Sequence, residues 1–262
     1  MGIINATPDS FSDGGTYDPI AQARQLIAEG ADVLDIGGES TRPGAEPVSA
    51  GDEIARVVPV IAALRAEWSG PISIDTLKPD VACAAFAAGA TIWNDVTALT
   101  HTPESLGVAA DLKAEVILMH MKGEPRTMQA APHYDDVVAE VEAYLLQRAE
   151  AAMRAGIARE KIWLDPGIGF GKTLDHNLAL IRATARLSSH GFPLLMAASR
   201  KRFIAALEER EGGAASDATQ RIGGTLAIHL HAAQQGAKML RVHDVAALRQ
   251  ALRVWGALSP FA

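Results

Sequence analysis

The chain has 262 residues, of which 48% are hydrophobic, and this length fits one globular domain with a sizeable core. Its formal net charge of −7 argues against a general nucleic-acid binder, which needs a basic face. No apolar stretch reaches the roughly 18–20 residues of a membrane span. The N-terminus also lacks the basic and apolar regions of a secretory signal. We therefore expect a cytoplasmic protein that binds neither nucleic acid nor membrane.

The single cysteine, Cys83, excludes a disulfide within the chain and a metal cluster built from cysteines. It lies in the apolar run Val81–Phe86. Because of these apolar neighbours, we expect a buried, inert thiol rather than a nucleophile.

Short apolar runs alternate along the chain with longer segments of helical period. The predicted strands are Gly2–Asn5, Val33–Gly37, Ile72–Asp75, Thr91–Asn94, Val116–His120, Ile162–Asp165, Leu194–Ala198 and Lys238–Val242. The predicted helices are Ile20–Glu29, Gly51–Glu67, Asp80–Ala88, Tyr134–Ala155, Leu174–Leu187, Thr219–Gln235 and Val245–Leu258. Alternation of this kind indicates a parallel sheet, and eight units allow closure into a (β/α)8 TIM barrel, one α/β domain over residues 1–262. An open, doubly wound sheet is the structural alternative.

Glycine recurs where predicted helices end. Gly30, Gly89 and Gly236 are each followed by alanine and then by a predicted strand. Glycine just past a helix end is the usual left-handed cap, so these positions support repeated helix–strand units. The polar, glycine-rich segment Glu208–Ser216 is predicted to be a surface loop.

Polar groups follow the carboxyl end of every predicted strand, which is where a barrel of this kind keeps its active site. These segments are Asn5–Gly15, Gly38–Gly44, Asp75-Thr76, Asn94-Asp95, Met119–Met121, Asp165–Lys172, Ser199–Lys201 and Arg241–Asp244. We expect them to converge on one mouth, because packing alone does not explain eight polar strand ends.

One group of these residues suits an anion. Arg241 and His243 are two residues apart and would face the same side of a strand. Arg42 lies in a loop bounded by glycine and proline, and Asn5 offers an amide oxygen. Such groups suit a diphosphate with Mg²⁺, which takes few protein oxygens besides phosphate and water. The alternative is that Arg241 and Asp244 form a structural ion pair, with His243 at the start of a helix.

A second group consists of Asp75, Asn94, Asp165 and Lys201. In a barrel mouth, two carboxylates, an amide and an ammonium group are costly without a partner. A flat heterocycle with a 2-amino-4-oxo edge would give donors to a carboxylate and an oxygen to the lysine. An internal salt-bridge network is the alternative.

The segment Asp165–Lys172 is glycine-rich but lacks the spacing of a phosphate-binding loop. Its glycines favour a tight turn close to a flat ligand, with Phe170 as an aromatic wall. His120 has no second histidine at ligand spacing, so we expect it to pack in the core rather than bind a metal.

Eight segments around these strand ends, in this order, resemble the dihydropteroate synthase family, the pterin-binding barrels of folate biosynthesis. They are Asn5–Gly15, Gly37–Gly44, Ser73–Thr76, Asn94-Asp95, Leu118–Gln129, Asp165–Lys172, Ser199–Lys201 and Arg241–Asp244. The resemblance runs from Gly2 to Trp255. It implies a transferase that joins 4-aminobenzoate to 7,8-dihydropterin-6-ylmethyl diphosphate and releases diphosphate, with Mg²⁺ and as a homodimer. It implies that Asp75, Asn94, Asp165 and Lys201 hold the pterin, that Asn5, Arg42, Arg241 and His243 hold the diphosphate with Mg²⁺, and that Phe11, Thr41, Pro43, Phe170 and Ser199 border the 4-aminobenzoate pocket.

Asp75, Lys201 and Arg42 are the catalytic residues that this resemblance implies. Loss of diphosphate leaves a cation on the pterin methylene, which the Asp75 carboxylate can stabilise. The arylamine is already a neutral nucleophile, and this explains why the sequence offers no obvious general base.

Two features depart from the family pattern. Ala197 stands where the family usually has glycine, and an added methyl group at a close-packed site could cost about 1–3 kcal/mol. Family members usually carry a hairpin before the first strand, whereas this sequence begins at the strand with Met1-Gly2, so either the bottom of the barrel is open or the start of the sequence has been placed too late. These two departures are the only support for the alternative of a catalytically weak pterin-binding paralogue. A pterin-binding methyltransferase domain is a third possibility, but it would not need the Glu39–Gly44 loop or the Ser199–Lys201 triplet.

Overall fold

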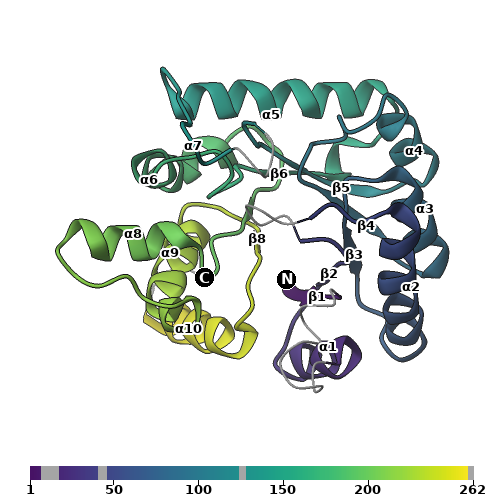
Figure 1. Ribbon diagram of the computed structural model, residues 1–262, viewed down its shortest axis with the longest axis horizontal. Helices are drawn as coiled ribbons and strands as arrows, with labels where there is room; N and C mark the ends of the chain where they lie inside the picture. The colour runs from purple at the N-terminus through teal and green to yellow at the C-terminus, as the bar shows by residue number, and fades with distance from the viewer. Residues whose placement is uncertain (7–17, 41–45, 124–127, 259–262) are drawn as a thin grey trace.

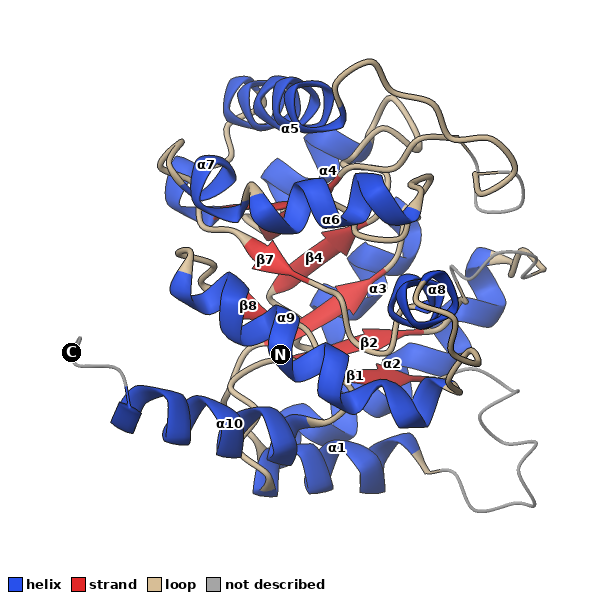
Figure 2. Cartoon of the chain, turned by 90° about the vertical axis from the view of Figure 1, so that its left-hand side faces the viewer, coloured by secondary structure: helices blue, strands red, loops and turns tan. Residues whose placement is uncertain are grey.

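The computed structural model describes residues 1–6, 18–40, 46–123 and 128–258. In these residues, parallel strands lie side by side inside a surrounding layer of helices (Figures 1 and 2). The fold is the predicted (β/α)8 TIM barrel rather than an open, doubly wound sheet.

Each predicted strand has a counterpart in the structure. The strands are β1 (Gly2–Asn5), β2 (Leu34–Gly37), β3 (Ile72–Asp75), β4 (Ile92–Asp95), β5 (Glu115–Met119), β6 (Ile162–Asp165), β7 (Leu195–Met196) and β8 (Met239–Leu240). Strands β1 to β6 pair in chain order, and β7 pairs with β8. Parallel bridges from Leu164 to Leu194 and from Gly2 to Val242 join the two sheets and close the barrel.

The helices cover the outside of the strands. They are α1 (Pro19–Ala28), α2 (Ala50–Glu67), α3 (Pro79–Ala88), α4 (Ser105–Asp111), α5 (Val137–Arg154), α6 (Leu174–Arg182), α7 (Thr184–Ser188), α8 (Arg202–Arg210), α9 (Ile222–Gln234) and α10 (Val245–Leu258). Helices α4 and α8 were not predicted, and α8 takes in the first residues of the segment that was predicted to be a surface loop, Glu208–Ser216. The predicted helix Leu174–Leu187 is divided into α6 and α7.

Local sequence signals explain several helix ends. The side chains of Ser49 and Asp136 accept hydrogen bonds from backbone amides in the first turns of α2 and α5. The predicted glycine caps are confirmed, because Gly30, Gly89 and Gly236 have φ of 96°, 117° and 98°. These left-handed residues turn the chain from each helix back towards the next strand.

Side chains alternate between the inside of the barrel and the layer under the helices. On β4, Trp93 belongs to the large outer core, whereas Ile92 belongs to a smaller cluster with Met1, Val33, Ile117, Leu195 and Ala197. By the same alternation, Asp35 on β2 and Asn94 on β4 point inwards. They lie two residues beyond Val33 and Ile92, and therefore nearer to the carboxyl ends of the strands.

Cys83 corrects one prediction, because its side chain is exposed rather than buried. It lies on α3, whose buried residues include Val81, Ala82 and Ala85. Successive residues of a helix point in directions about 100° apart, so Cys83 faces solvent although its sequence neighbours face the core. An apolar run within a helix therefore did not show which of its members would be buried.

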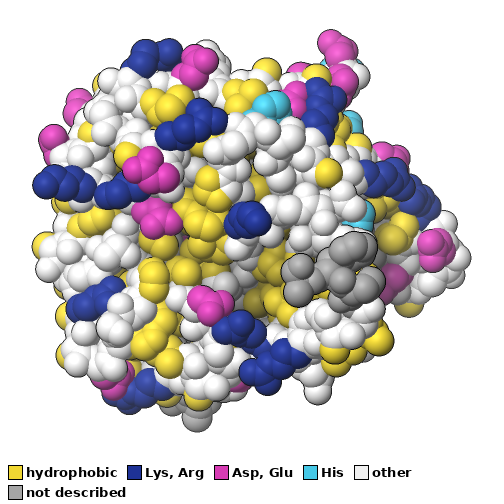
Figure 3. Space-filling model, turned by 180° about the vertical axis from the view of Figure 1, so that it is seen from behind, with side chains coloured by type: hydrophobic (Ala, Val, Ile, Leu, Met, Phe, Trp, Pro, Cys, Tyr) yellow, Lys and Arg dark blue, Asp and Glu magenta, His cyan; other side chains and the backbone are white. Residues whose placement is uncertain are grey.

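Hydrophobic side chains gather around a central hollow on the face of the molecule in Figure 3. A cavity of about 290 Å³ lies beside the amino ends of β1 and β8, lined among others by Met1, Val33, Met239 and Leu240. In the part of the chain that the structure describes, no helix is both long and apolar enough to cross a bilayer.

Candidate active site

An arginine between two aspartates is the central feature of the barrel mouth. Arg241, just past β8, donates from Nε to Asp35 Oδ2 at 2.6 Å and from Nη2 to Asp75 Oδ2 at 2.7 Å. Asn94 Nδ2 donates to the same Asp35 oxygen at 3.2 Å. The register of the sheet accounts for this meeting, because Gly37, Asp75 and Asn94 are neighbours across β2, β3 and β4. Since Gly37 has no side chain, Asp35 below it remains in reach of Arg241.

The electrostatics of this cluster favour a charged arginine and a carboxyl group with an unusual pKa. Burial raises the pKa of Asp75 to about 7, with a further contribution from Asp35 and opposition from Arg241. For Arg241, burial works against the charge, but Asp35 and Asp75 outweigh it and the pKa rises. Among the described residues, no side chain or backbone group pairs with the buried Asp35 Oδ1. The cluster therefore holds an acceptor oxygen that a ligand could use.

Asp165 and Lys201 form the opposite wall of the mouth. Asp165 is buried and accepts a hydrogen bond from Gly167 N at 2.7 Å, and burial raises its pKa. Lys201 donates to the carbonyl of Ile168, and its Nζ lies 4.3 Å from the centre of the Phe170 ring. Burial lowers the pKa of Lys201 to about 8, which the nearby Asp165 only partly opposes. Lys201 thus lies over the glycine-rich turn that follows β6.

The glycines of this turn are needed for close approach. A Cβ atom on Gly167 would lie 1.9 Å from the carbonyl oxygen of His120, and one on Gly171 would lie 2.2 Å from that of Lys122. Both residues also have positive φ, 65° and 62°. The tight turn that the sequence predicted is therefore confirmed, and it packs on the segment that follows β5.

Lys172 stabilises the contact between this turn and the segment after β5. Its buried Nζ lies 3.0 Å from His120 Nδ1, 3.2 Å from His120 O and 3.0 Å from Phe170 O. His120 packs edge-on against Tyr144, as its predicted core role requires. Burial lowers the pKa of Lys172 to about 7 and that of His120 to about 3, so the histidine is neutral.

A third cluster joins the ends of β7 and β8. Ser199 Oγ lies 3.0 Å from His243 Nδ1 and accepts a hydrogen bond from His243 N at 3.2 Å. Arg200 donates to both carboxylate oxygens of Asp244, at 2.9 and 2.5 Å. The alternative of an Arg241–Asp244 ion pair is therefore wrong, because each of these residues has a different partner.

The structure brings most of the predicted site residues to one end of the barrel. Asp75, Asn94 and Arg241 form one contact network, and Lys201 contacts the turn that carries Asp165 and Phe170. Asn5 ends β1 next to Gly37 in the register. Phe11, Thr41, Arg42 and Pro43 lie outside the described residues.

The sequence patterns did not reveal Asp35, Lys172 or an ion-pair cluster at the carboxyl end of β2. In this cluster, Lys78 Nζ lies 2.6 Å from both Glu39 Oε2 and Glu53 Oε2, and Glu53 is fully buried. The signal for Asp35 was present, because an acidic residue inside an otherwise apolar strand requires a buried partner. Nothing comparable marked Glu53, which lies in an amphipathic helix with many charges.

The chain is similar to known proteins over nearly its whole length. The sequence model of the family described as "Pterin binding enzyme" matches residues 1–243. The chain is 45% identical over 262 residues to dihydropteroate synthase from Synechocystis sp., covering 98% of this chain and 89% of that one. A structure of Xanthomonas albilineans dihydropteroate synthase with 4-aminobenzoic acid has a TM-score of 0.91 and 50% identity, covering 100% of this chain and 93% of that one. A structure of the same enzyme with 7,8-dihydropteroate has a TM-score of 0.88 and 47% identity, covering 100% and 94%.

Proposed function

The chain belongs to the dihydropteroate synthase family of pterin-binding enzymes, and we propose that the cluster around Arg241 is its reaction centre. The reaction is a transfer of the 7,8-dihydropterin-6-ylmethyl group from diphosphate to the amine of 4-aminobenzoate, which gives 7,8-dihydropteroate in folate biosynthesis.

Asp75, Asn94, Asp165 and Lys201 bind the pterin in this proposal. Among the described residues, the buried carboxyl group of Asp165 accepts a hydrogen bond only from the backbone amide of Gly167, so one face is available to the amino edge of a pterin. Lys201 is held over Phe170 and can donate to the pterin oxygen. The raised pKa of both aspartates supports a site that becomes complete when a polar ligand enters.

The chemical step follows from the position of Asp75 beside Arg241. As the bond to diphosphate breaks, positive charge develops on the pterin methylene and negative charge on the leaving group. An ionised Asp75 stabilises the positive charge on the methylene, and Arg241 stabilises the negative charge on the leaving group. The two residues pair with each other in the free site, and during the reaction each of them stabilises one developing charge. The amine of 4-aminobenzoate then attacks with its own lone pair and loses a proton.

Arg241, His243 and Asn5 bind the diphosphate, with Arg42 from the segment outside the described residues. Within the described part of the chain, no three His, Cys, Asp or Glu side chains lie close enough together to hold a metal ion without other ligands. Asn5 offers one amide oxygen at the end of β1, which fits an Mg²⁺ ion held mainly by phosphate and water. When bound, Mg²⁺ would neutralise charge on the diphosphate. Ser199 supports this group through His243, 3.0 Å from its Oγ.

Phe170 and Ser199 border the 4-aminobenzoate pocket, together with Phe11, Thr41 and Pro43 from segments outside the described residues. Phe170 supports this assignment because it lies on the glycine-rich turn next to Lys201, at the edge of the pterin group. An aromatic ring there gives the second substrate an apolar surface to stack on.

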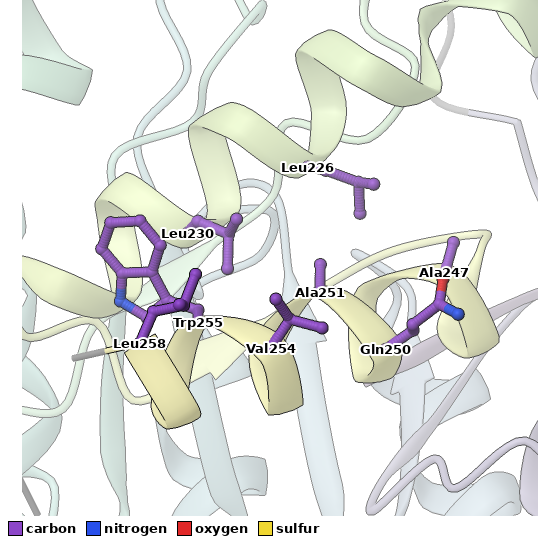
Figure 4. Close-up of a pocket in the computed structure, with 8 residues that line it drawn as sticks. All are labelled: Leu226, Leu230, Ala247, Gln250, Ala251, Val254, Trp255 and Leu258. Atoms are coloured by element: carbon purple, nitrogen blue, oxygen red, sulfur yellow. The ribbon is translucent and has the colours of Figure 1, made fainter.

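A homodimer is part of the same proposal. Helices α9 and α10 enclose an apolar groove of about 310 Å³, in which Leu226 and Leu230 face Val254 and Trp255 (Figure 4). Val254 and Leu258 on α10 are 55% and 76% exposed. A second copy of the chain would bury them. The cytoplasmic location stays a prediction from the sequence.

The meeting of Arg241, Asp35 and Asp75 is the observation that carries the proposed mechanism. The test is diphosphate release from the pterin diphosphate, measured with and without 4-aminobenzoate. We expect release that depends on the amine. A pterin-binding paralogue would bind the pterin without release, and a methyltransferase domain would not respond to the amine.

A further inference from the structure

Arg200 has an unusual backbone conformation between two residues of the proposed site. Its φ is 58°, in the left-handed region that favours glycine. It is flanked by Ser199, which contacts His243, and by Lys201, which lies over Phe170. The direction of both neighbouring side chains therefore depends on a backbone conformation that arginine does not prefer.

Three side chains in one row contact this turn, one from the residue before α9 and two from α9 itself. Arg221, the residue before α9, donates from Nη1 to Arg200 O at 3.0 Å. Thr225 Oγ1 accepts a hydrogen bond from Arg200 N at 3.0 Å, and His229 Nε2 lies 3.5 Å from Ala198 N. The spacing of four residues places them in one row along the helix.

Helix α9 itself sets the orientation of these groups. Thr225 Oγ1 donates to Arg221 O at 2.8 Å, so its lone pairs remain for Arg200 N. His229 Nδ1 lies 2.7 Å from Thr225 O, which assigns the proton to Nδ1 and leaves Nε2 as an acceptor. Burial lowers the pKa of His229 to about 4, in agreement with a neutral ring.

Close packing leaves α9 little room to shift. A Cβ atom on Gly224, the residue before Thr225, would lie 2.6 Å from Ile204 Cγ2 of α8. Thr225 is 1% exposed. On the other side of the turn, the Arg200 side chain is held by Asp244. The turn is therefore held from both sides. Groups on α9 bind the backbone of Arg200, and Asp244 binds its guanidinium group.

We propose that Thr225 is a positioning residue for the reaction, with Arg221 and His229 in support. By accepting from Arg200 N, it holds the left-handed turn so that Ser199 and Lys201 point into the mouth. This inference rests on the proposed function of Lys201, and it gives α9 a role that acts through the turn at Arg200.

The test compares Thr225→Val, which keeps the shape but loses the acceptor, with Thr225→Ser, which keeps the hydroxyl group. Thr184→Val is the matched control, because Thr184 is also fully buried and its Oγ1 also bonds a carbonyl of the preceding turn, Ile181 O at 2.7 Å. For each variant, kcat and KM are measured for both substrates, and the Kd of a free pterin is measured by calorimetry.

We expect Thr225→Val to weaken free pterin binding and to lower kcat/KM by about 10- to 100-fold, since a small displacement of site groups has effects of that size. Thr225→Ser should restore both within about threefold. Thr184→Val should lower Tm without changing either. Should Thr225→Val not fold, Arg221→Gln removes the bond to Arg200 O and should weaken pterin binding in the same direction.

Unchanged pterin binding and kcat/KM in Thr225→Val would overturn the inference, as would equal losses in Thr225→Ser or Thr184→Val. Failure of the proposed function looks different. In that case the unmodified chain itself would show no release of diphosphate dependent on 4-aminobenzoate.

Discussion

Arg241 donates to Asp75 at 2.7 Å, and this contact joins the last strand of the barrel to its third strand. From their positions in the sequence, Arg241 is expected to hold the diphosphate and Asp75 the pterin, as separate groups. In the structure the two groups share a border. A change on one side should therefore be felt on the other.

Replacement of Arg241 by alanine should weaken both diphosphate and free pterin. Loss of one partner of a buried charge pair costs about 2–5 kcal/mol, so we expect at least about 30-fold weaker diphosphate binding and a smaller loss for pterin. If the diphosphate and pterin groups were independent, free pterin binding would be almost unchanged. Calorimetric titration of both ligands decides between these results. Arg249→Ala is the control, because Arg249 binds Gly30 O and Asp32 instead.

Replacement of Lys201 by alanine should abolish most activity and spare the fold. Asp165 and Asp75 would lose a nearby cation, at a cost of about 3–5 kcal/mol in the complex, which corresponds to a loss of about two to nearly four orders of magnitude in kcat/KM. In the free protein, water can replace the ammonium group. Steady-state kinetics and thermal unfolding measure the two effects. Lys161→Ala, which removes a lysine bound to the carbonyl of Lys113 at 2.8 Å, should leave both unchanged. Near-normal turnover of Lys201→Ala would exclude the role.

The pH dependence of kcat/KM should be bell-shaped. Activity needs an ionised Asp75, whose raised pKa of about 7 makes activity increase with pH through that value. It also needs a protonated Lys201, whose lowered pKa of about 8 makes activity fall above that value. Lys201→Arg should remove the alkaline limb and keep the acid limb. A flat profile from about pH 6 to pH 9 would contradict both assignments.

The same pKa shifts predict how stability depends on pH. Lys172 has a pKa near 7 when folded and about 10.5 when unfolded, so the unfolded chain binds more protons between these values. Its contribution to the free energy of unfolding therefore rises with pH across this window. Unfolding by urea at several pH values should show a smaller rise for Lys172→Met than for the unmodified chain. An identical rise in both would show that folding does not lower the pKa of Lys172.

Replacement of Val254 by glutamate should separate a dimer formed through the groove of α9 and α10. A charge buried in an apolar contact is strongly unfavourable, so the variant should sediment as a monomer. Ala143→Glu, at an exposed position on α5, is the matched control and should not change the mass. Analytical ultracentrifugation measures both. If the unmodified chain sedimented as a monomer, the proposed homodimer through this groove would be wrong.

Sequence patterns were sufficient for the strands, because each buried apolar run ends in polar residues and is followed by a helical segment. They failed for α8, because its charged residues resemble those of a surface loop. In the structure, Phe203 and Ile204 of this helix are buried. Asp165 and Lys201 could be proposed as site residues, because each follows a predicted strand at its carboxyl end. Asp35 was missed although a buried acid stood out in its strand, because its partner Arg241 comes from the last strand and reaches it only when the barrel closes. Lys172 was missed because its contact with His120 forms only when the turn after β6 packs on the segment after β5.

Asp75 offers the most direct test of the mechanism, since it is assigned to stabilise the cation rather than only to bind the pterin. Asp75→Asn keeps the shape and a hydrogen-bonding group but removes the charge. We expect kcat for diphosphate release in the presence of 4-aminobenzoate to fall at least about 100-fold, with free pterin bound within about tenfold of normal. A variant that retained near-normal kcat would contradict the role of this carboxylate and the mechanism built on it.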